Sequence, residues 1–201
     1  MSCKKYVVSL CKRDDVKDFV EQHHYSKNIN GVISDYCFSL KDDRGNLIGA
    51  MIFGRMAMAG QYKKFSDNAE DVIELRRLVL VDNTLRNAES YFIGKALKYL
   101  KKNTQIKVVV SYADLTHGHS GIVYKASNFK LHSVSPRQKK ISFNGKLYHD
   151  KSLRTKNKGI LKPFSVRLRS ALEAGEANWV TCDVKNCYTY ILKVDKNMSK
   201  S

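Results

Sequence analysis

The chain has 201 residues with 36 Lys and Arg against 19 Asp and Glu, which gives a formal charge of +17 at pH 7. This charge predicts a polyanionic partner. A hydrophobic content of 43% with only two prolines excludes wholesale disorder, and no apolar stretch approaches the ~20 residues of a membrane span. The first residues do not form an export signal, so we expect a cytoplasmic protein with no membrane partner.

The N-terminal half of the chain predicts strands that alternate with two helices. In chain order the expected elements are a strand at 5–10, a helix from Asp14 or Asp15 to about 25, strands at 35–40, 47–55 and 74–81, a helix at 88–102 and a strand at 106–112. The polar loop with Gly45 between the second and third strands indicates a hairpin. The nearly continuous apolar strand at 106–112 indicates a strand covered on both faces.

The C-terminal half predicts shorter elements. They are a helix at 120–127, a hairpin at 141–148 around Asn144-Gly145, a helix at 163–174 and a closing hairpin at 178–194 around 184–186. We therefore expect a single α/β domain over 1–201, with a mixed sheet flanked by helices. Its core would comprise about 5–135 plus the hairpin 178–194, with a basic segment at about 135–170 inserted or packed on its edge.

Five cysteines are scattered through the sequence. Their odd number and the lack of an export signal indicate reduced thiols. The spacing of Cys182 and Cys187 lacks the second pair or nearby His of a zinc site. We expect these two residues to face each other across the closing hairpin.

Positive charge is concentrated in the last third of the chain. Residues 130–201 carry +11 of the total +17, and the densest part lies between Arg137 and Arg169. Aromatic residues are interleaved with the basic ones, which is typical of a nucleic-acid surface. A solvated face and an RNA or ribosomal partner are the alternatives. The residues expected to bind DNA are Arg137, Lys139, Lys140, Lys146, Lys151, Arg154, Lys156 and Lys158.

Residues 75–129 resemble the core of the GNAT acyltransferases. The segment 124–129 is similar to the Y-x-x-x-G-F pattern of that superfamily, with Asn128 in place of Gly. The resemblance implies a GNAT-like mixed sheet flanked by helices, and a Tyr124 that protonates a leaving group. The loop 86–90 lacks the glycines that hold a CoA pyrophosphate, and Glu89 adds negative charge there. Acetyl-CoA is therefore not the expected donor, and the donor is left open.

Four segments resemble a more specific family. They are His24-Tyr25-Ser26, 74–78, 86–90 and the block 111–128 with its Ser-Tyr-Ala-Asp start. They are similar to the Mom family of phage DNA-modification proteins. That resemblance implies a transferase that adds a methylcarbamoyl group to the N6 amine of adenine in DNA. Such modification protects phage DNA from restriction in the host cytoplasm.

The resemblance also implies roles for individual residues. The implied catalytic residues are Asp114, Tyr124, Tyr25 and Ser111, and the implied cofactor-binding residues are Arg77, Arg86, Asn87, Glu89 and Ser90. Asp114 follows an expected strand at the edge where open α/β sheets bind ligands. A helix cap or turn is the alternative for Asp114, and a core anchor is the alternative for Tyr124. Neighbouring strand residues point to opposite faces, so only one of Arg76 and Arg77 can face the cleft, and the resemblance implies Arg77.

Iron is the implied metal, held by His24 and Tyr25. Adjacent helical residues point about 100° apart, so this pair alone does not complete a metal site. His117 and His119 are further candidates for ligands. The alternative is that His24 positions DNA or is a surface histidine.

Two other functions compete with DNA modification. One is an acetyl-CoA-dependent N-acetyltransferase acting on a protein or a small amine. The other is a non-catalytic DNA-binding protein on the same fold. A homodimer would double the basic surface, but no sequence pattern demonstrates one.

Overall fold

The computed structural model describes residues 3–115, 118 and 120–193. The described chain divides into two compact units. The first comprises 1–113, 121–133 and 187–201, and the second comprises 114–120 and 134–186. The second unit therefore consists of two segments, each inserted between segments of the first.

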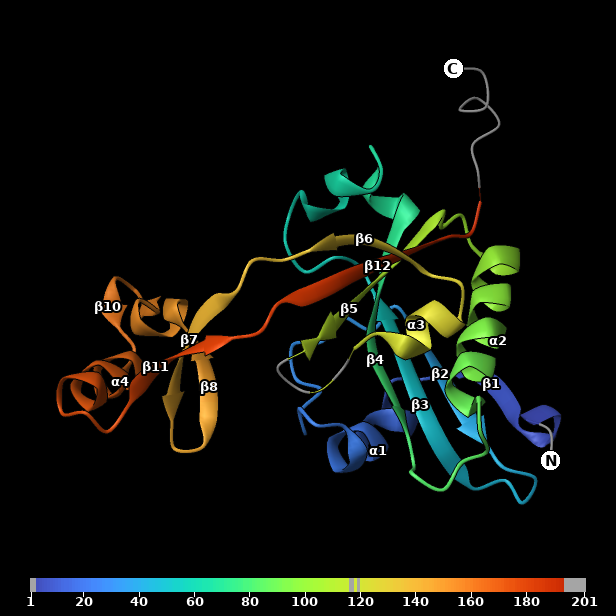
Figure 1. Cartoon of the computed structure of the whole chain (residues 1–201), viewed down its shortest axis with the longest axis horizontal. Helices are drawn as coiled ribbons and strands as arrows, with labels where there is room; N and C mark the ends of the chain where they lie inside the picture. Colours follow the sequence, from blue (N-terminus) through green and yellow to red (C-terminus); the bar gives the residue numbers. More distant parts are fainter. Residues whose placement is uncertain (1–2, 116–117, 119, 194–201) are drawn as a thin grey trace. The chain divides into compact units, whose positions relative to one another are not determined.

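A seven-stranded sheet organises the first unit (Figure 1). Its strands are β1 (Val7–Cys11), β2 (Tyr36–Lys41), β3 (Leu47–Gly54), β4 (Val72–Leu80), β5 (Val108–Asp114), β6 (Lys130–Val134) and β12 (Lys185–Ile191). Their order is β1-β2-β3-β4-β5-β12-β6. The pairs β1–β2, β2–β3 and β3–β4 are antiparallel, and the pair β4–β5 is parallel. The hairpin predicted around Gly45 is confirmed, since β2 pairs with β3 and Gly45 has φ of 85°.

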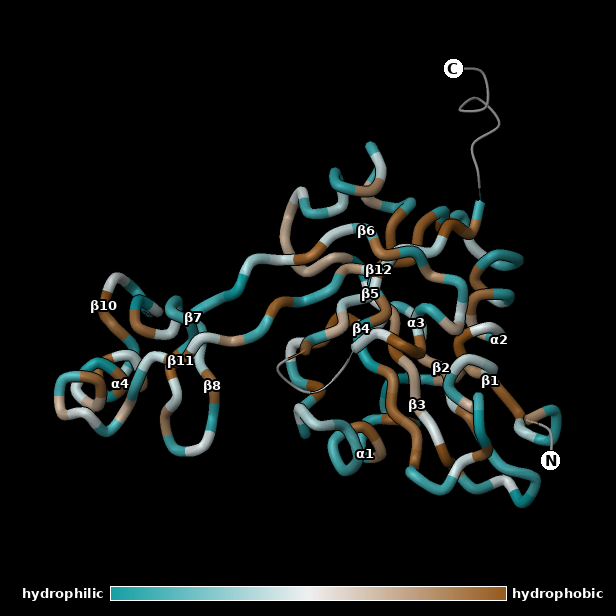
Figure 2. Tube along the Cα trace, in the orientation of Figure 1, coloured by the Kyte–Doolittle hydropathy of each residue, from teal (hydrophilic) through white to brown (hydrophobic). Residues whose placement is uncertain are grey.

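Apolar side chains cover both faces of this sheet. The helices of the first unit are α1 (Asp14–His23), α2 (Ala88–Asn103) and α3 (Ile122–Ala126), with short 3-10 turns at Cys3–Lys5, Gln61–Lys64 and Ala69–Asp71. On one side α1 packs through Val16 and Val20 against a cluster that includes Ile52. On the other side α2 packs through Phe92 and its apolar neighbours against a larger cluster. Figure 2 shows these hydrophobic segments within the strands and along α2.

The expected burial of the strand at 106–112 is confirmed. Val109 belongs to the cluster beneath α2, whereas Val108 and Val110 belong to a different cluster with Cys187. Because successive side chains of a strand alternate between faces, both faces of β5 are covered. Packing on both faces fixes the position of β5, and several candidate site residues lie at its C-terminal end.

The second unit has a sheet and a core of its own. Its elements are β7 (Gln138–Phe143), β8 (Lys146–His149), a 3-10 turn at Asp150–Leu153, β9 (Lys156–Asn157), β10 (Ile160–Leu161), α4 (Pro163–Glu173) and β11 (Asn178–Cys182). The strands pair in the order β11-β7-β8, and β9 pairs separately with β10. Ile141 and Leu168 are fully buried in a cluster beneath α4. The tight turn predicted at Asn144-Gly145 is confirmed, with φ of 48° and 70° at these residues.

The closing hairpin predicted at 178–194 is wrong. β11 pairs with β7, whereas β12 joins the seven-stranded sheet, so the two strands do not pair with each other. Cys182 and Cys187 therefore do not face each other across a hairpin, and both thiols are free. Two consecutive apolar strands with a short polar connection have the pattern of a hairpin. That pattern does not specify which strand each of them pairs with.

The single domain expected over 1–201 stays a prediction. The second unit, which contains the basic segment, has a core of its own. No helix in the described residues is both long enough and apolar enough to cross a bilayer.

Candidate functional site

Tyr124 is fixed in the first unit by α3 and by contacts with other aromatic rings. Its ring centroid lies 5.5 Å from that of Tyr188 and 5.7 Å from that of Phe129. Ser111, which is fully buried in β5, acts on the Tyr124 hydroxyl as a hydrogen-bonding side chain, and its own Oγ donates to the carbonyl of Leu75 at 3.4 Å. The structure thus brings together two of the predicted catalytic residues.

The surroundings of Tyr124 keep its hydroxyl protonated. Burial raises the pKa of Tyr124, and the nearby Tyr25, Glu89 and Glu74 raise it further, whereas the hydrogen bond from Ser111 acts in the opposite direction. A phenol with a raised pKa is a poor base at neutral pH but remains able to donate a proton. The position therefore suits a general acid.

Gly121 sets the position of α3 and hence of Tyr124. It precedes the helix with φ of 78°, and a Cβ at this position would lie 2.4 Å from Cε2 of Tyr188. Tyr188 is fully buried, so its ring has no free volume into which to move. Only glycine combines this φ with this close approach.

We expect Gly121→Ala to lower the free energy of unfolding by about 2–4 kcal/mol, through backbone strain at positive φ and overpacking against Tyr188. Chemical denaturation followed by circular dichroism measures the change. Gly118→Ala is the control, because Gly118 has φ of 75° with no atom within 4 Å of an added Cβ. A Gly121→Ala variant no less stable than this control contradicts the account.

Two asparagines adopt the conformation that glycine usually supplies. Asn128 has φ of 63° and Asn87 has φ of 67°, both in the left-handed region. Asparagine is one of the few other residues that tolerate this region. The loop before α2 and the turn after α3 therefore adopt this left-handed conformation without a glycine at these two positions.

Arg77 lies beside a bulge in β4. The pairing of β3 with β4 shifts register between Ile52 and Phe53, so Arg76 is the extra residue. Nη1 of Arg77 donates to the carbonyl of Arg76 at 2.7 Å, and its buried Nε has no hydrogen-bond partner among the described residues. Burial lowers the pKa of Arg77, an effect opposed by interaction with Tyr25. Tyr25 therefore influences the pKa of both Arg77 and Tyr124.

His24 and Tyr25 follow α1 directly. His24 is 7% exposed and its ring centroid lies 4.2 Å from that of the exposed Tyr25. The backbone N–H of Ser26 donates to Nδ1 of His24 at 3.1 Å, so Nε2 carries the proton of the neutral ring or binds another group. The surface alternative for His24 is thus wrong, because the ring is buried.

The described residues do not complete an iron site around His24 and Tyr25. They contain no group of three or more His, Cys, Asp or Glu side chains able to hold a metal ion. His117 and His119 lie outside the described residues. Among the described residues, His24 and Tyr25 are thus the two candidate ligands for iron, and a third is not supplied by a cluster of His, Cys, Asp or Glu.

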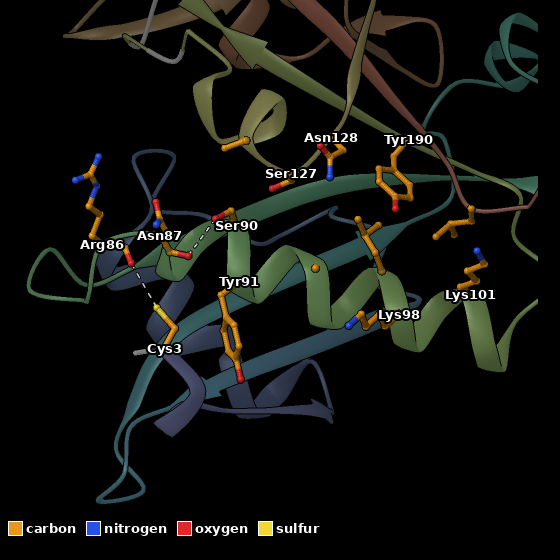
Figure 3. A pocket seen from close by; sticks show the side chains of 14 residues that line it. Cys3, Arg86, Asn87, Ser90, Tyr91, Lys98, Lys101, Ser127, Asn128 and Tyr190 are labelled. Atoms are coloured by element: carbon orange, nitrogen blue, oxygen red, sulfur yellow. Dashed lines mark hydrogen bonds between the residues drawn. The ribbon is translucent and has the colours of Figure 1, made fainter. Parts of the chain in front are cut away.

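A cavity of about 670 Å³ lies along α2 in the first unit (Figure 3). It brings together three predicted cofactor-binding residues, Arg86, Asn87 and Ser90, at the N-terminal end of the helix. The other residues labelled around it include Tyr91, Lys98, Lys101, Ser127, Asn128 and Tyr190. Three basic side chains and no acidic one contribute to the lining, so the cavity favours an anionic ligand.

The other two predicted cofactor-binding residues lie elsewhere. Glu89 lines a separate, smaller cavity of about 300 Å³, and it acts on the pKa of Tyr124. Arg77 lines neither cavity. The negative charge expected to oppose a phosphate in the larger cavity is therefore absent from its lining.

Asp114 forms an ion pair within the second unit. It is the last residue of β5, and its Oδ2 lies 2.8 Å from Nζ of Lys185. Asp114 is only 7% exposed, so its carboxylate needs a compensating charge. The turn alternative for Asp114 does not describe this position, because the residue completes a strand.

The predicted DNA-binding residues all lie in the second unit. They occur on or beside β7 and β8, in the 3-10 turn at 150–153, and in the β9–β10 hairpin. Only Lys140 is partly buried, and the others are exposed. Arg154 pairs with Asp150 at 2.5 Å and Arg137 approaches Asp183 at 3.7 Å. Most of the basic charge is therefore directed to solvent.

Sequence reasoning missed several residues that the structure places at these sites. Lys185 lies far from Asp114 in the sequence, and no motif connects the two. Lys98 and Lys101 occur in α2 at a spacing of three residues, which places them on one helical face and is the one local signal available. Glu74 belongs to the resembling segment 74–78, but the sequence does not predict that its charge acts on Tyr124.

The fold defines a class of protein. An acetyltransferase from Bacillus subtilis, solved with CoA, matches with a TM-score of 0.55 and 12% identity, covering 94% of this chain and 100% of that one. A spermidine/spermine N-acetyltransferase from Vibrio cholerae matches with a TM-score of 0.52 and 10% identity, covering 98% and 99% of the two chains. The chain therefore has the expected GNAT-like α/β fold.

The family follows from comparison of sequences. Residues 5–201 match the Mom protein family, and the chain belongs to it. It is 28% identical over 148 residues to the methylcarbamoylase Mom of Escherichia phage Mu. The match covers 71% of this chain but only 59% of that protein.

Proposed function

We propose that the protein modifies phage DNA by transferring a methylcarbamoyl group to the N6 amine of adenine, which protects the DNA from restriction in the host cytoplasm. Membership of the Mom family and the name of the phage Mu relative support this activity. The observation that carries it here is Tyr124, whose ring packs against Phe129 and Tyr188 and whose hydroxyl is influenced by Ser111 of β5, in a GNAT-like fold. DNA is the partner because the second unit presents exposed basic side chains.

Tyr124 acts as the general acid of this reaction. The N6 nitrogen forms a bond to the carbonyl carbon of the transferred group, and the bond from that carbon to the leaving group breaks. The leaving group departs with the electron pair and takes a proton from the Tyr124 hydroxyl. Ser111 orients that hydroxyl, and the raised pKa keeps it protonated until transfer.

Asp114 accepts the proton that the N6 nitrogen loses as the new bond forms. The lone pair of this amine is delocalised into the purine ring, so removal of a proton assists its attack. The ion pair with Lys185 holds the carboxylate in one orientation. Tyr25 and Arg77 contribute to the electrostatic surroundings of Tyr124.

The donor occupies the cavity along α2. Arg86, Lys98 and Lys101 line it without an acidic neighbour in the lining, which fits an anionic donor. Asn87 and Ser90 add polar groups at the first turn of the helix, where backbone N–H groups favour negative charge. This arrangement leaves an acyl-CoA-dependent N-acetyltransferase as the second candidate.

Nucleoside mass spectrometry of plasmid DNA from cells that express the protein tests the proposal. We expect deoxyadenosine with a mass increase equal to one methylcarbamoyl group, together with resistance of the plasmid to adenine-sensitive restriction. Unmodified deoxyadenosine from cells with folded, abundant protein would overturn the proposed activity. Tight binding of acetyl-CoA with acetylation of a polyamine or protein would favour the second candidate.

A further inference from the structure

The β9–β10 hairpin of the second unit carries a solitary exposed apolar side chain. Ile160 is 76% exposed, the highest value for a large apolar residue among those described. Burial of such a side chain is favourable by about 1.5–3 kcal/mol, so its full exposure has a cost that a binding partner would remove. The neighbouring Leu161 is partly buried, which leaves Ile160 alone at the end of the hairpin.

The hairpin is a narrow projection with a tight turn. Ile160 pairs with Asn157, and only Lys158 and Gly159 connect them. Both connecting residues have positive φ, 49° and 81°, as in a type I′ turn. Ile160 is therefore the first residue after the turn, next to the tip.

The base of the hairpin is fixed to α4. The backbone N–H of Lys162 donates to the carbonyl of Thr155 at 2.9 Å, and the hydroxyl of Ser165 donates to the same carbonyl at 3.1 Å. Ser165 is 1% exposed and lies on the helical face that buries Leu168. The projection is thus mounted on the core of the second unit and is not a free loop.

The sequence around Ile160 is uniformly basic. Residues 151–172 contain seven Lys and Arg and no Asp or Glu. Lys156, Lys158 and Lys162, all exposed, belong to the hairpin or adjoin it. Lysines that flank one apolar tip match duplex DNA, which presents phosphates on either side of a groove and stacked apolar bases within it.

We infer that Ile160 is a wedge that inserts between base pairs of duplex DNA while the flanking lysines bind the phosphates on either side. The inference rests on the proposed function for its substrate. A modified adenine has to leave the stack, because its N6 amine is paired within the duplex. Apolar side chains inserted from a protein unstack base steps and so lower the cost of extruding a nucleotide.

Permanganate footprinting of a protein-bound duplex tests this inference, since permanganate oxidises unstacked thymines and needs no knowledge of the target sequence. We expect wild-type protein to create reactive thymines and Ile160→Ala to remove most of that reactivity, with duplex affinity within about threefold. Ile160→Lys should bind at least as tightly through its added charge and still fail to unstack. Ile191→Ala is the matched control, because Ile191 is 54% exposed on β12 of the first unit.

Modification assays give a second result that is separate from unstacking. If the protein modifies adenine, Ile160→Ala should lower modification of duplex DNA at least about tenfold and that of single-stranded DNA less than about twofold. Equal reactivity of thymines with wild type and Ile160→Ala would overturn the wedge, as would parallel losses of affinity and unstacking. Loss of binding to another protein or to vesicles, with unchanged footprints, would assign Ile160 to that partner. Absence of modified nucleoside with clear unstacking would overturn the proposed reaction and leave the wedge standing.

Discussion

Replacing Tyr124 with Phe should lower DNA modification at least about 100-fold while the protein remains folded, because the phenol would be the proton donor to the leaving group. The ring is retained, so its contacts with Phe129 and Tyr188 persist. Loss of the hydrogen bond with Ser111 should cost only about 1 kcal/mol of stability. The measurement is the fraction of modified deoxyadenosine per unit of folded protein.

Tyr99→Phe is the matched control for this substitution. Tyr99 lies in α2, and its ring packs edge-on against Phe38 with centroids 5.4 Å apart, a contact that Phe reproduces. Activity should persist in the control. If Tyr124→Phe protects DNA from restriction as well as wild type does, then the alternative of a non-catalytic DNA-binding protein gains support instead.

Replacing Asp114 with Asn should also lower modification by about 100-fold or more, because the amide cannot accept the proton from the adenine amine. The change is nearly isosteric, and Lys185 keeps 40% of its side chain in solvent. We therefore expect a loss of stability of about 1 kcal/mol or less from the broken pair. Single-turnover modification of a DNA duplex, with stability measured in parallel, separates the two effects.

Asp150→Asn controls for the added positive charge. Asp150 is partly exposed and pairs with Arg154, so this variant gains the same charge in the same unit. Both variants should bind duplex DNA slightly more tightly at low salt. An Asp114→Asn variant that modifies DNA at the rate of Asp150→Asn would exclude Asp114 as the base.

Local signals in the sequence were sufficient for most elements. Periodicity predicted α1 and α2, a single Gly predicted the β2–β3 hairpin, and Asn144-Gly145 predicted the β7–β8 turn. Each of these signals depends on residues that are close together in the sequence. The pattern at 124–129 likewise predicted a catalytic role for Tyr124 from neighbouring residues.

Long-range contacts were the part that sequence patterns did not predict. The apolar alternation of β11 and β12 indicated strands but not their partners, and the hairpin inferred from their proximity was wrong. The ion pair of Asp114 with Lys185 depends on chain reversal through the whole second unit. The cavity along α2 likewise combines residues near the N-terminus with Tyr190.

The sequence by itself determined that the chain is strongly basic, that its charge is concentrated in the last third, and where most of its strands and helices lie. Net charge is a sum over residues, and helices and strands follow short-range periodicities, so both can be predicted without knowing the fold. Only the tertiary structure decided that the basic segment has its own core, that Ser111 meets Tyr124, and that Ile160 stands exposed among lysines. Burial and pairing depend on which distant segments meet, and a strand's own pattern does not specify its partner.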